Sequence, residues 1–378
     1  MENRIIKWLW ALSLGLLTAC SCSNHQMDGS ALKLSDNQAD DKAIQLYHKL
    51  QKNLDKGIML GHQDDLAYGY RWFMEAGRSD VKSVCGDYPA VVGWDLGGLE
   101  TGCRTNCDSI PFSALKGYVR QVEQQGGISI FTWRAGNPVG GENAGDSTRQ
   151  DVVKQIVENG AVQQRFLASL DKVASFFTEL KDEEGKPISV IFQPFQSITA
   201  DSAMWWTPAR CSANDFKKLW SLTVDYLRNK KGVHNLLYAY SVGNGHTAET
   251  LQAYYPGNSR VDIVGLNALL LQKDSCDTQT FIQQFNRNIA IITQFAEKNK
   301  KVPAITYTGL ESVKVSDFFS QDLYPVISQY KLSFVMFGAN AWNQEEHYFI
   351  PVPGHPASDD FVRFASYPDI LTSNDIKE

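Results

Sequence analysis

Eight short apolar runs, separated by longer amphipathic segments, set the strongest limit on how this chain folds. They occupy residues 57–63, 90–96, 128–134, 189–195, 235–241, 261–267, 302–308 and 332–338. Near-continuous hydrophobicity over six or seven residues is typical of parallel strands that are covered on both faces. Between the runs, residues 161–181 and 278–299 repeat apolar side chains every three or four positions, as amphipathic helices do.

Eight strand–helix units within a chain of 378 residues predict an α/β fold, namely a single (β/α)8 TIM barrel. A doubly wound sheet is the alternative. It is disfavoured because the first run is not followed by the glycine-rich loop that a dinucleotide-binding site requires. In (β/α)8 barrels the functional side chains lie at the carboxyl ends of the strands, so we expect the site there.

The predicted strand ends are rich in aromatic and amide side chains. Indole rings stack on the apolar faces of sugars, while amides and guanidinium groups bind sugar hydroxyls. This mixture predicts a carbohydrate-binding cleft. The structural alternatives are that a single tryptophan fills the base of a loop and that a histidine at a strand end is hydrogen-bonded into the barrel rim. The candidate binding residues are His62, Trp94, Trp133, Arg134, Asn137, Gln196, Trp205, Trp206, Tyr240 and Asn267.

The N-terminus has the pattern of a targeting segment. Arg4 and Lys7 precede an apolar run at residues 8–17, which is too short to span a hydrocarbon core of about 30 Å. The sequence LTAC that ends at Cys20 resembles a bacterial lipobox, in which the cysteine is lipidated; a plain cleaved signal peptide is the alternative. We therefore expect a signal peptide at 1–20, a polar flexible tether at 21–38 and the barrel at 39–378.

Lipidation of Cys20 predicts attachment to the bacterial outer membrane. In the bacteria that export such proteins to the surface, acidic residues follow the lipidated cysteine. Residues 21–27 contain neither Asp nor Glu, which favours the periplasmic side over the surface.

The net charge and the cysteine content limit which partners, disulfides and metal sites we expect. The net charge of -6, without any basic run, argues against nucleic acid. Beyond Cys20, six cysteines in an oxidising compartment allow one to three disulfides, and Cys103 and Cys107 are the nearest pair in sequence. No metal or cofactor is predicted, because no Cys or His pairs stand at ligand spacing.

Several segments are similar to glycoside hydrolase family 26, the β-mannanase family, and in particular to its lipoprotein members from glycan-utilising gut bacteria. They are LGHQDDLAYGYRW (60–72), GRSDVKSVCGDYPAVVGWDLGGLE (77–100), LWSLTVDYLR (219–228), HNLLYAYS (234–241), YYPGNSRVDIVG (254–265) and PVPGHPASDDF (351–361). The resemblance implies a ligand of the β-mannan class or a related plant oligosaccharide. It also implies a retaining mechanism, with an acid/base Glu after the fourth strand and a nucleophilic Glu at the end of the seventh.

This sequence departs from that pattern at both positions. The acid/base position is Ser197 and the nucleophile position is Tyr307. Arg134 replaces a histidine that follows the third strand, Asn267 replaces an aspartate after the sixth, and Gly338 with Ala339 replaces a Trp-Arg pair after the eighth. A serine hydroxyl is not a general acid near neutral pH, and loss of that role alone costs about 10² to 10⁴ in rate.

Three interpretations follow. The first is a protein that binds glycan but has lost most or all of its catalysis. The second is an active glycosidase with a rebuilt mechanism, in which Tyr307 is the nucleophile and Asp64, Asp201 or Glu311 supplies the acid. The third is an envelope protein with an interaction or structural role and a vestigial cleft. The fixed charge of Arg134 further favours an acidic or substituted sugar.

Overall fold

The structure is a computed structural model that describes residues 33–140, 144–145, 151–198 and 204–377. Contacts divide the chain into a short unit at Met1–Ala31 and a large one at Leu32–Glu378, and the description below concerns the second. The predicted lipidation site Cys20, most of the predicted tether and the candidate acid Asp201 lie outside the described residues.

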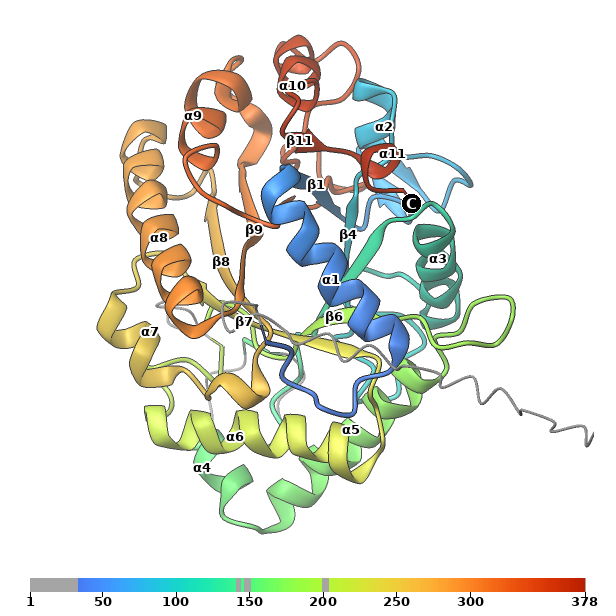
Figure 1. Cartoon of the computed structure of the whole chain (residues 1–378), viewed down its shortest axis with the longest axis vertical. Coiled ribbons are helices and arrows are strands. Elements are labelled where there is room, and N and C mark those ends of the chain that lie inside the picture. The colour runs from blue at the N-terminus through green and yellow to red at the C-terminus, as the bar shows by residue number, and fades with distance from the viewer. Residues whose placement is uncertain (1–32, 141–143, 146–150, 199–203, 378) are drawn as a thin grey trace, which may run out of the picture. The chain divides into compact units, whose positions relative to one another are not determined.

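Eight parallel strands form a closed barrel (Figure 1). Each strand pairs with its neighbours in chain order, and β10 pairs with β1 to close the ring. The strands are β1 (Ile58–Gln63), β4 (Val91–Asp95), β5 (Ile128–Thr132), β6 (Val190–Gln193), β7 (Leu236–Gly243), β8 (Ile263–Leu270), β9 (Val302–Leu310) and β10 (Phe334–Phe337). All eight coincide with the predicted apolar runs, which confirms the (β/α)8 TIM barrel.

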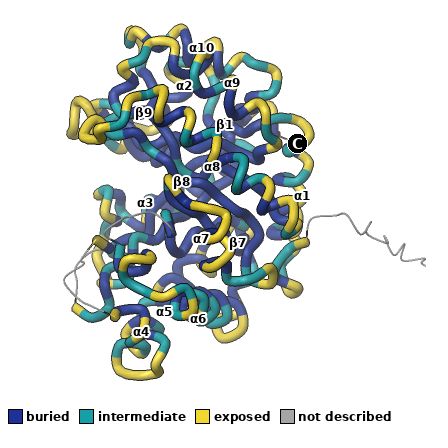
Figure 2. The backbone as a smooth tube through the Cα atoms, turned by 90° about the vertical axis from the view of Figure 1, so that its left-hand side faces the viewer, coloured by how far each residue is buried: buried dark blue, intermediate teal, exposed yellow. Residues whose placement is uncertain are grey.

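Helices surround the strands, and Figure 2 shows exposed helical residues outside a buried centre. The predicted helices at 161–181 and 278–299 are confirmed as α5 (Ala161–Thr178) and α8 (Thr278–Asn299). No helix in the described ranges is long and apolar enough to span a membrane. The other helices are α1 (Asp41–Lys56), α2 (Asp80–Cys85), α3 (Phe112–Gln124), α4 (Val152–Val157), α6 (Ala213–Asp225), α7 (Ala248–Tyr254), α9 (Tyr324–Ile327), α10 (Ser358–Ala365) and α11 (Ser373–Ile376).

Two short strand pairings lie outside the eight-stranded ring. β2 (Tyr68–Gly69) and β3 (Trp72–Phe73) form a small antiparallel hairpin after β1. β11 (Ile370–Leu371) runs parallel to the first residues of β1 and brings the C-terminal segment against the barrel.

Side chains alternate along each strand between the barrel interior and the helices. The interior positions form a separate aliphatic cluster, whereas the outward positions, such as Phe131, Phe192 and Tyr238, belong to the larger core beneath the helices. The interior cluster contains Met59, Val91, Ile128, Ile130, Ile191, Leu237, Ala239, Ile263, Val302, Ala304, Phe334 and Met336.

Helix α1 closes the amino-terminal end of the barrel. Its apolar residues Ala43, Leu46, Tyr47 and Leu50 belong to the interior cluster. Hydrogen bonds to the segments that precede two of the strands hold α1 in place. The backbone amide of Asp40 donates to the His234 carbonyl, just before β7, at 3.1 Å. The Lys49 ammonium donates to a carbonyl just before β5. With this end covered, the carboxyl ends of the strands are the open end of the barrel.

The sequence predicts a flexible tether up to residue 38, but Ser35 and Asp36 are bound to the barrel. The Ser35 amide donates to the buried Asp262 carboxylate at 2.6 Å, and Asp36 is itself buried, with its carboxylate 2.8 Å from His234 Nδ1. The polar composition of this segment suggested solvation, but its polar groups instead satisfy buried partners on the barrel.

We expect Gly265→Ala to destabilise the barrel. Gly265 lies on the interior face of β8, where a Cβ would stand 2.4 Å from Ser241 Oγ and 2.7 Å from a Thr306 methyl carbon. Overpacking of this kind costs about 1–3 kcal/mol. The matched control is Gly117→Ala in α3, where a Cβ meets no atom within 4 Å and where alanine stabilises a helix by about 0.5–1 kcal/mol.

Urea unfolding, followed by circular dichroism, measures both effects on the same scale. The midpoint should fall for Gly265→Ala and rise slightly for Gly117→Ala. A Gly265→Ala midpoint equal to that of the parent protein would show that the interior layer at this level is not tightly packed.

Candidate functional site

A cavity of about 290 Å³ opens at the carboxyl ends of the strands. Its walls come from the ends of β1, β4, β5 and β9 and from the loops that follow β4, β6 and β10. Most of the lining side chains are polar. They include Gln63, Asp64, Tyr68, Asp95, Asp108, Thr132, Arg134, Gln196, Tyr307, Trp342 and His347.

Strand alternation decides which strand-end residues reach this cavity. On β4 the interior face continues from Val91 through Gly93 to Asp95, and on β5 it continues from Ile130 through Thr132 towards Arg134. Gly93 leaves room for the side chain of Gln63. A Cβ on residue 93 would lie only 2.2 Å from Gln63 Oε1. The interior of the barrel is therefore aliphatic below and polar at the open end.

Arg134 is held between two carboxylates. Its Nε donates to Asp95 Oδ2 at 2.6 Å, and one terminal nitrogen donates to Asp108 Oδ2 at 2.5 Å. Asp95 Oδ1 also accepts the Arg134 amide at 3.1 Å, so the arginine is fixed at both ends. Burial raises the pKa of Asp108, and the neighbouring guanidinium opposes that rise.

The prediction that Arg134 favours an acidic sugar is therefore not supported by its surroundings. No sequence pattern predicts that Asp95, from β4, and Asp108, from a loop, both contact the same guanidinium. Its positive charge is more than balanced by two carboxylates, and it does not present a free cation to a ligand.

Asp64 is a buried carboxyl at the base of the cavity. It follows β1 in a left-handed conformation, with φ of 58°. Its Oδ2 accepts hydrogen bonds from Gln63 Nε2 at 3.0 Å and from the Tyr68 hydroxyl at 2.9 Å, whereas Oδ1 has no partner among the described residues. Burial, with a smaller contribution from Asp108, raises the pKa of Asp64 well above its usual value.

A network of hydroxyl and amide groups surrounds Ser197, which lies in the loop after β6. Asn267 Nδ2 donates to Ser197 Oγ at 3.3 Å, and Asn267 Oδ1 accepts the hydroxyl of Thr306. Thr306 and Ser241 bring their hydroxyl oxygens to 2.8 Å. Ser197 is thus an ordered polar group beside the cavity, hydrogen-bonded to an amide rather than to a base.

A β-bulge aims Tyr307 into the cavity. The register of β8 against β9 pairs Leu266 with Ile305 and then Asn267 with Tyr307, so that Thr306 is the extra residue. A bulge lets two successive side chains face the same side of a sheet. Thr306 accordingly contacts the interior hydroxyl of Ser241, while Tyr307 both packs on the interior cluster and lines the cavity.

The phenol of Tyr307 is held in its protonated form near neutral pH. Burial is the main cause that raises its pKa above the usual value of about 10. Arg134 acts in the opposite direction, but the carboxyl groups of Asp108 and Asp64 raise the pKa further.

One wall of the cavity is aromatic. Trp342, in the loop after β10, is 39% exposed and lies with its ring centroid 5.0 Å from that of Phe73 on the β2–β3 hairpin. Next to it, His347 Nδ1 lies 2.5 Å from Glu311 Oε1. Glu311 also accepts a hydrogen bond from the backbone N–H of Gln272 at 2.8 Å. Both carboxylate oxygens of this candidate acid therefore already have partners.

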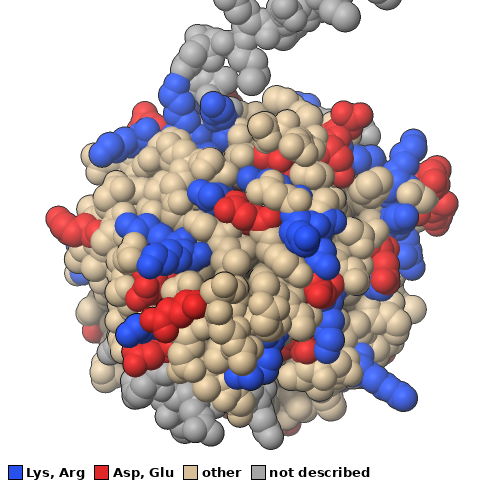
Figure 3. Space-filling model, turned by 90° about the horizontal axis from the view of Figure 1, so that it is seen from below, with Lys and Arg blue, Asp and Glu red and all other residues tan. Residues whose placement is uncertain are grey.

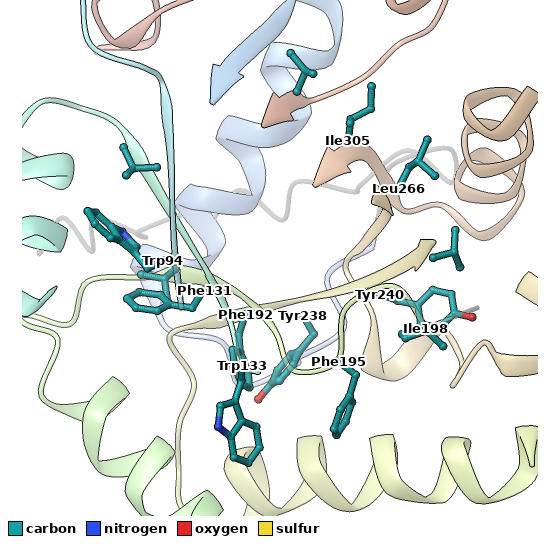
Figure 4. Packing of buried hydrophobic residues seen from close by; sticks show 14 of the residues in the cluster. Trp94, Phe131, Trp133, Phe192, Phe195, Ile198, Tyr238, Tyr240, Leu266 and Ile305 are labelled. Atoms are coloured by element: carbon teal, nitrogen blue, oxygen red, sulfur yellow. The ribbon is translucent and has the colours of Figure 1, made fainter. Parts of the chain in front are cut away.

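Four predicted stacking residues lie in the core instead of the cavity. Trp94, Trp133, Trp205 and Trp206 are at most 1% exposed, and none of them lines the cavity. Trp94 and Trp133 occupy outward positions on their strands, and Figure 4 shows Trp133 and Phe195 pointing toward a surrounding helix. Because other side chains cover their ring faces, these indoles cannot stack on a sugar in this conformation.

Three other predicted binding residues also have structural partners. His62 is buried, with Nδ1 2.7 Å from Asp65. Asn137 is buried in its loop and accepts the Val139 amide at 2.9 Å, and the Tyr240 hydroxyl donates to the Leu251 carbonyl at 3.2 Å beneath the helices. Of the predicted binding and nucleophile residues, Arg134, Gln196 and Tyr307 line the cavity, as does the candidate acid Asp64. Ser197 and Asn267 lie beside it.

Neither disulfides nor metal groups appear in the described ranges. Cys85, Cys103, Cys107, Cys211 and Cys276 are all unpaired. No three His, Cys, Asp or Glu side chains of the described residues are grouped so that they would hold a metal ion.

Comparison with known proteins places this chain in a family. The model of glycosyl hydrolase family 26 matches residues 35–323. The chain belongs to glycosyl hydrolase family 26. A mannan endo-1,4-β-mannosidase of Bifidobacterium adolescentis is 30% identical over 298 residues, which are 75% of this chain and 28% of that protein. One from Bacillus subtilis is 29% identical over 212 residues, which are 53% of this chain and 56% of the relative.

Solved structures agree with this assignment. A family 26 β-mannanase from Bacteroides ovatus superposes with a TM-score of 0.85 and 37% identity, covering 89% of this chain and 97% of that one. The catalytic domain of an endo-β-1,4-mannanase from a Bacillus species gives a TM-score of 0.83 at 27% identity, with 93% and 96% covered.

We expect Asp64→Asn to stabilise the protein increasingly as the pH rises above about 4. The folded-state pKa of Asp64 is raised, so above the unfolded value the unfolded chain releases a proton that the folded chain retains. The free energy of unfolding therefore falls as the pH rises, until the pH exceeds the pKa of Asp64 in the folded state. Asparagine resembles the neutral acid and removes this loss, with a gain in Tm of about 2–4 °C per kcal/mol at alkaline pH.

Thermal unfolding between pH 4 and pH 8 measures this difference. Asp55→Asn, which removes an exposed carboxylate paired with Lys331, is the control and should show little change with pH. A Tm difference between Asp64→Asn and the parent that stays constant across this range would contradict the prediction.

Proposed function

We propose that this family 26 protein binds an oligosaccharide of the β-mannan class in the cavity and hydrolyses it very slowly or not at all. The mannan specificity of its relatives supports the ligand class. The observation that carries the loss of hydrolysis is the identity of the strand-end residues: Ser197 follows β6, and Tyr307 projects from β9.

The retaining mechanism needs a pair of carboxyl groups about 5–5.5 Å apart, one as acid/base and one as nucleophile. At the corresponding positions this chain offers a serine hydrogen-bonded to Asn267 and a tyrosine whose pKa is raised. No glutamate is among the described residues that line the cavity. When both partners of such a pair are absent, substrate binding is the function that remains.

Binding requires none of the missing groups. Trp342 offers an exposed ring at the wall of the cavity, and Gln63, Gln196 and Thr132 supply amide and hydroxyl groups for sugar hydroxyls. An aromatic wall with polar side chains opposite is a common arrangement for holding a pyranose ring.

A glycosidase with a rebuilt mechanism is the second candidate. Asp64 supports it, because a carboxyl with a raised pKa at the base of a cavity is suited to proton donation. The environment of Tyr307 opposes it, because burial and two neighbouring carboxyls disfavour the phenolate that a nucleophile requires.

We further infer that the mature protein is held in the cell envelope by a lipid on Cys20, facing the periplasm. This rests on the lipobox-like sequence and on the absence of acidic residues at 21–27. Metabolic labelling with a fatty-acid probe, compared between the natural chain and Cys20→Ser, tests it directly. Unchanged labelling in the variant would rule the anchor out.

We expect calorimetry of residues 21–378 with mannohexaose to show saturable binding, while reducing-sugar assays on the same samples show no product. Trp342→Ala should weaken binding about 5- to 10-fold through the loss of stacking, whereas Trp342→Phe, which keeps a ring, should lose less. Hydrolysis at the rate of an ordinary mannanase would refute the proposal. Absence of binding to any mannan or glucomannan would instead favour an interaction or structural role.

We also expect the double substitution Ser197→Glu and Tyr307→Glu to restore no more than trace hydrolysis. A carboxylate at 307 would lie near Asp64 and Asp108, which would raise its pKa and reduce the fraction that is ionised. Rates at least about 100-fold below those of the Bacteroides ovatus enzyme are expected in parallel assays. Comparable rates would show that the two carboxylates are all that the site lacks.

A further inference from the structure

The cavity contains more carboxyl groups than cations. Asp64, Asp95 and Asp108 line it, and Glu311 stands behind His347. The basic side chains that line the cavity are those of Arg134 and His347. By contrast, both signs are interspersed on the face shown in Figure 3.

The guanidinium does not serve as a free anion receptor. Arg134 uses its Nε on Asp95 and a terminal nitrogen on Asp108, so its charge is already shared between two carboxylates. A sugar acid entering the cavity would meet uncompensated carboxyl groups, and like charges at short range are repulsive.

Asp64 adds an independent observation that points to a ligand. Its side chain is fully buried, lines the cavity and has an Oδ1 atom without a partner among the described residues. Its other oxygen already accepts two hydrogen bonds, from Gln63 and Tyr68. A buried carboxyl oxygen without a partner is costly. A positively charged donor from a ligand would satisfy it and would lower the raised pKa of Asp64, so that binding favours the ionised form of this carboxyl.

An ammonium group matches this environment better than a hydroxyl. It carries the compensating charge and three donors on a tetrahedral nitrogen, so that a single group can bind two carboxylates. The ring that carries it retains an apolar face, for which Trp342 is the exposed partner at the cavity wall.

We propose that the cavity recognises a saccharide with a free amino group, a glucosamine-like unit, through the carboxyl groups of Asp64 and Asp108. The inference rests on the glycan-binding part of the proposed function, and it ranks an amino sugar above the β-mannan class as the preferred ligand. The neutral mannose unit becomes the weaker ligand, and uronic acids are excluded.

Calorimetry at low ionic strength on residues 21–378 tests this with four tetrasaccharides. The probes are fully deacetylated glucosamine tetramer, its N-acetylated form, mannotetraose and tetragalacturonate. We expect the glucosamine tetramer to bind about 10-fold or more tightly than mannotetraose, with one site per chain. Acetylation should abolish this advantage, and tetragalacturonate should not bind.

Substitutions distinguish the cavity from general attraction to an acidic protein. Asp64→Asn and Asp108→Asn should each reduce the affinity for the glucosamine tetramer about 10-fold and change that for mannotetraose by less than about threefold. Asp55→Asn, an exposed carboxylate on α1, should leave both affinities unchanged.

The outcomes separate the two proposals. Mannotetraose binding as tightly as the glucosamine tetramer would overturn the amino-sugar inference and leave the proposed function standing. Glucosamine binding that is insensitive to both cavity substitutions would also overturn it, because the ammonium would then lie elsewhere. If no tetrasaccharide binds, the proposed glycan-binding function fails together with the inference.

Discussion

The alternation of side chains along eight closed strands determines where every other part of this site lies. A closed parallel barrel leaves each strand residue two destinations, the interior or the layer beneath the helices. The interior is filled by aliphatic side chains at the end that α1 covers and by polar ones at the other end. Because the aliphatic layers support the polar residues from below, the cavity floor has a fixed geometry before any loop is considered.

The sequence was sufficient for the architecture and for part of the site. The length and hydrophobicity of the apolar runs predict all eight strands. Alternation along these strands also places Trp94, Phe131 and Trp133 on the outward face, and Asp95 and Thr132 on the interior face. Loop residues offered no such rule. Asp108, Trp342 and His347 reach the cavity only because of the paths their loops follow, which depend on tertiary contacts far apart in the chain.

Charge at the site depends on partners more than on residue type. Arg134 alone suggests an anion receptor, but between Asp95 and Asp108 it is part of an acidic group. The same holds for the hydroxyls of Ser197 and Tyr307. Ser197 accepts a hydrogen bond from an amide, and burial together with two neighbouring carboxyls raises the pKa of the Tyr307 phenol.

The contacts of Ser35 and Asp36 have a consequence for orientation. These residues bind next to the starts of β7 and β8, at the end of the barrel that α1 closes. The chain therefore enters the folded unit on the side opposite the cavity. Any attachment through the N-terminus would therefore join the folded unit at its closed base, at the end of the barrel opposite the cavity.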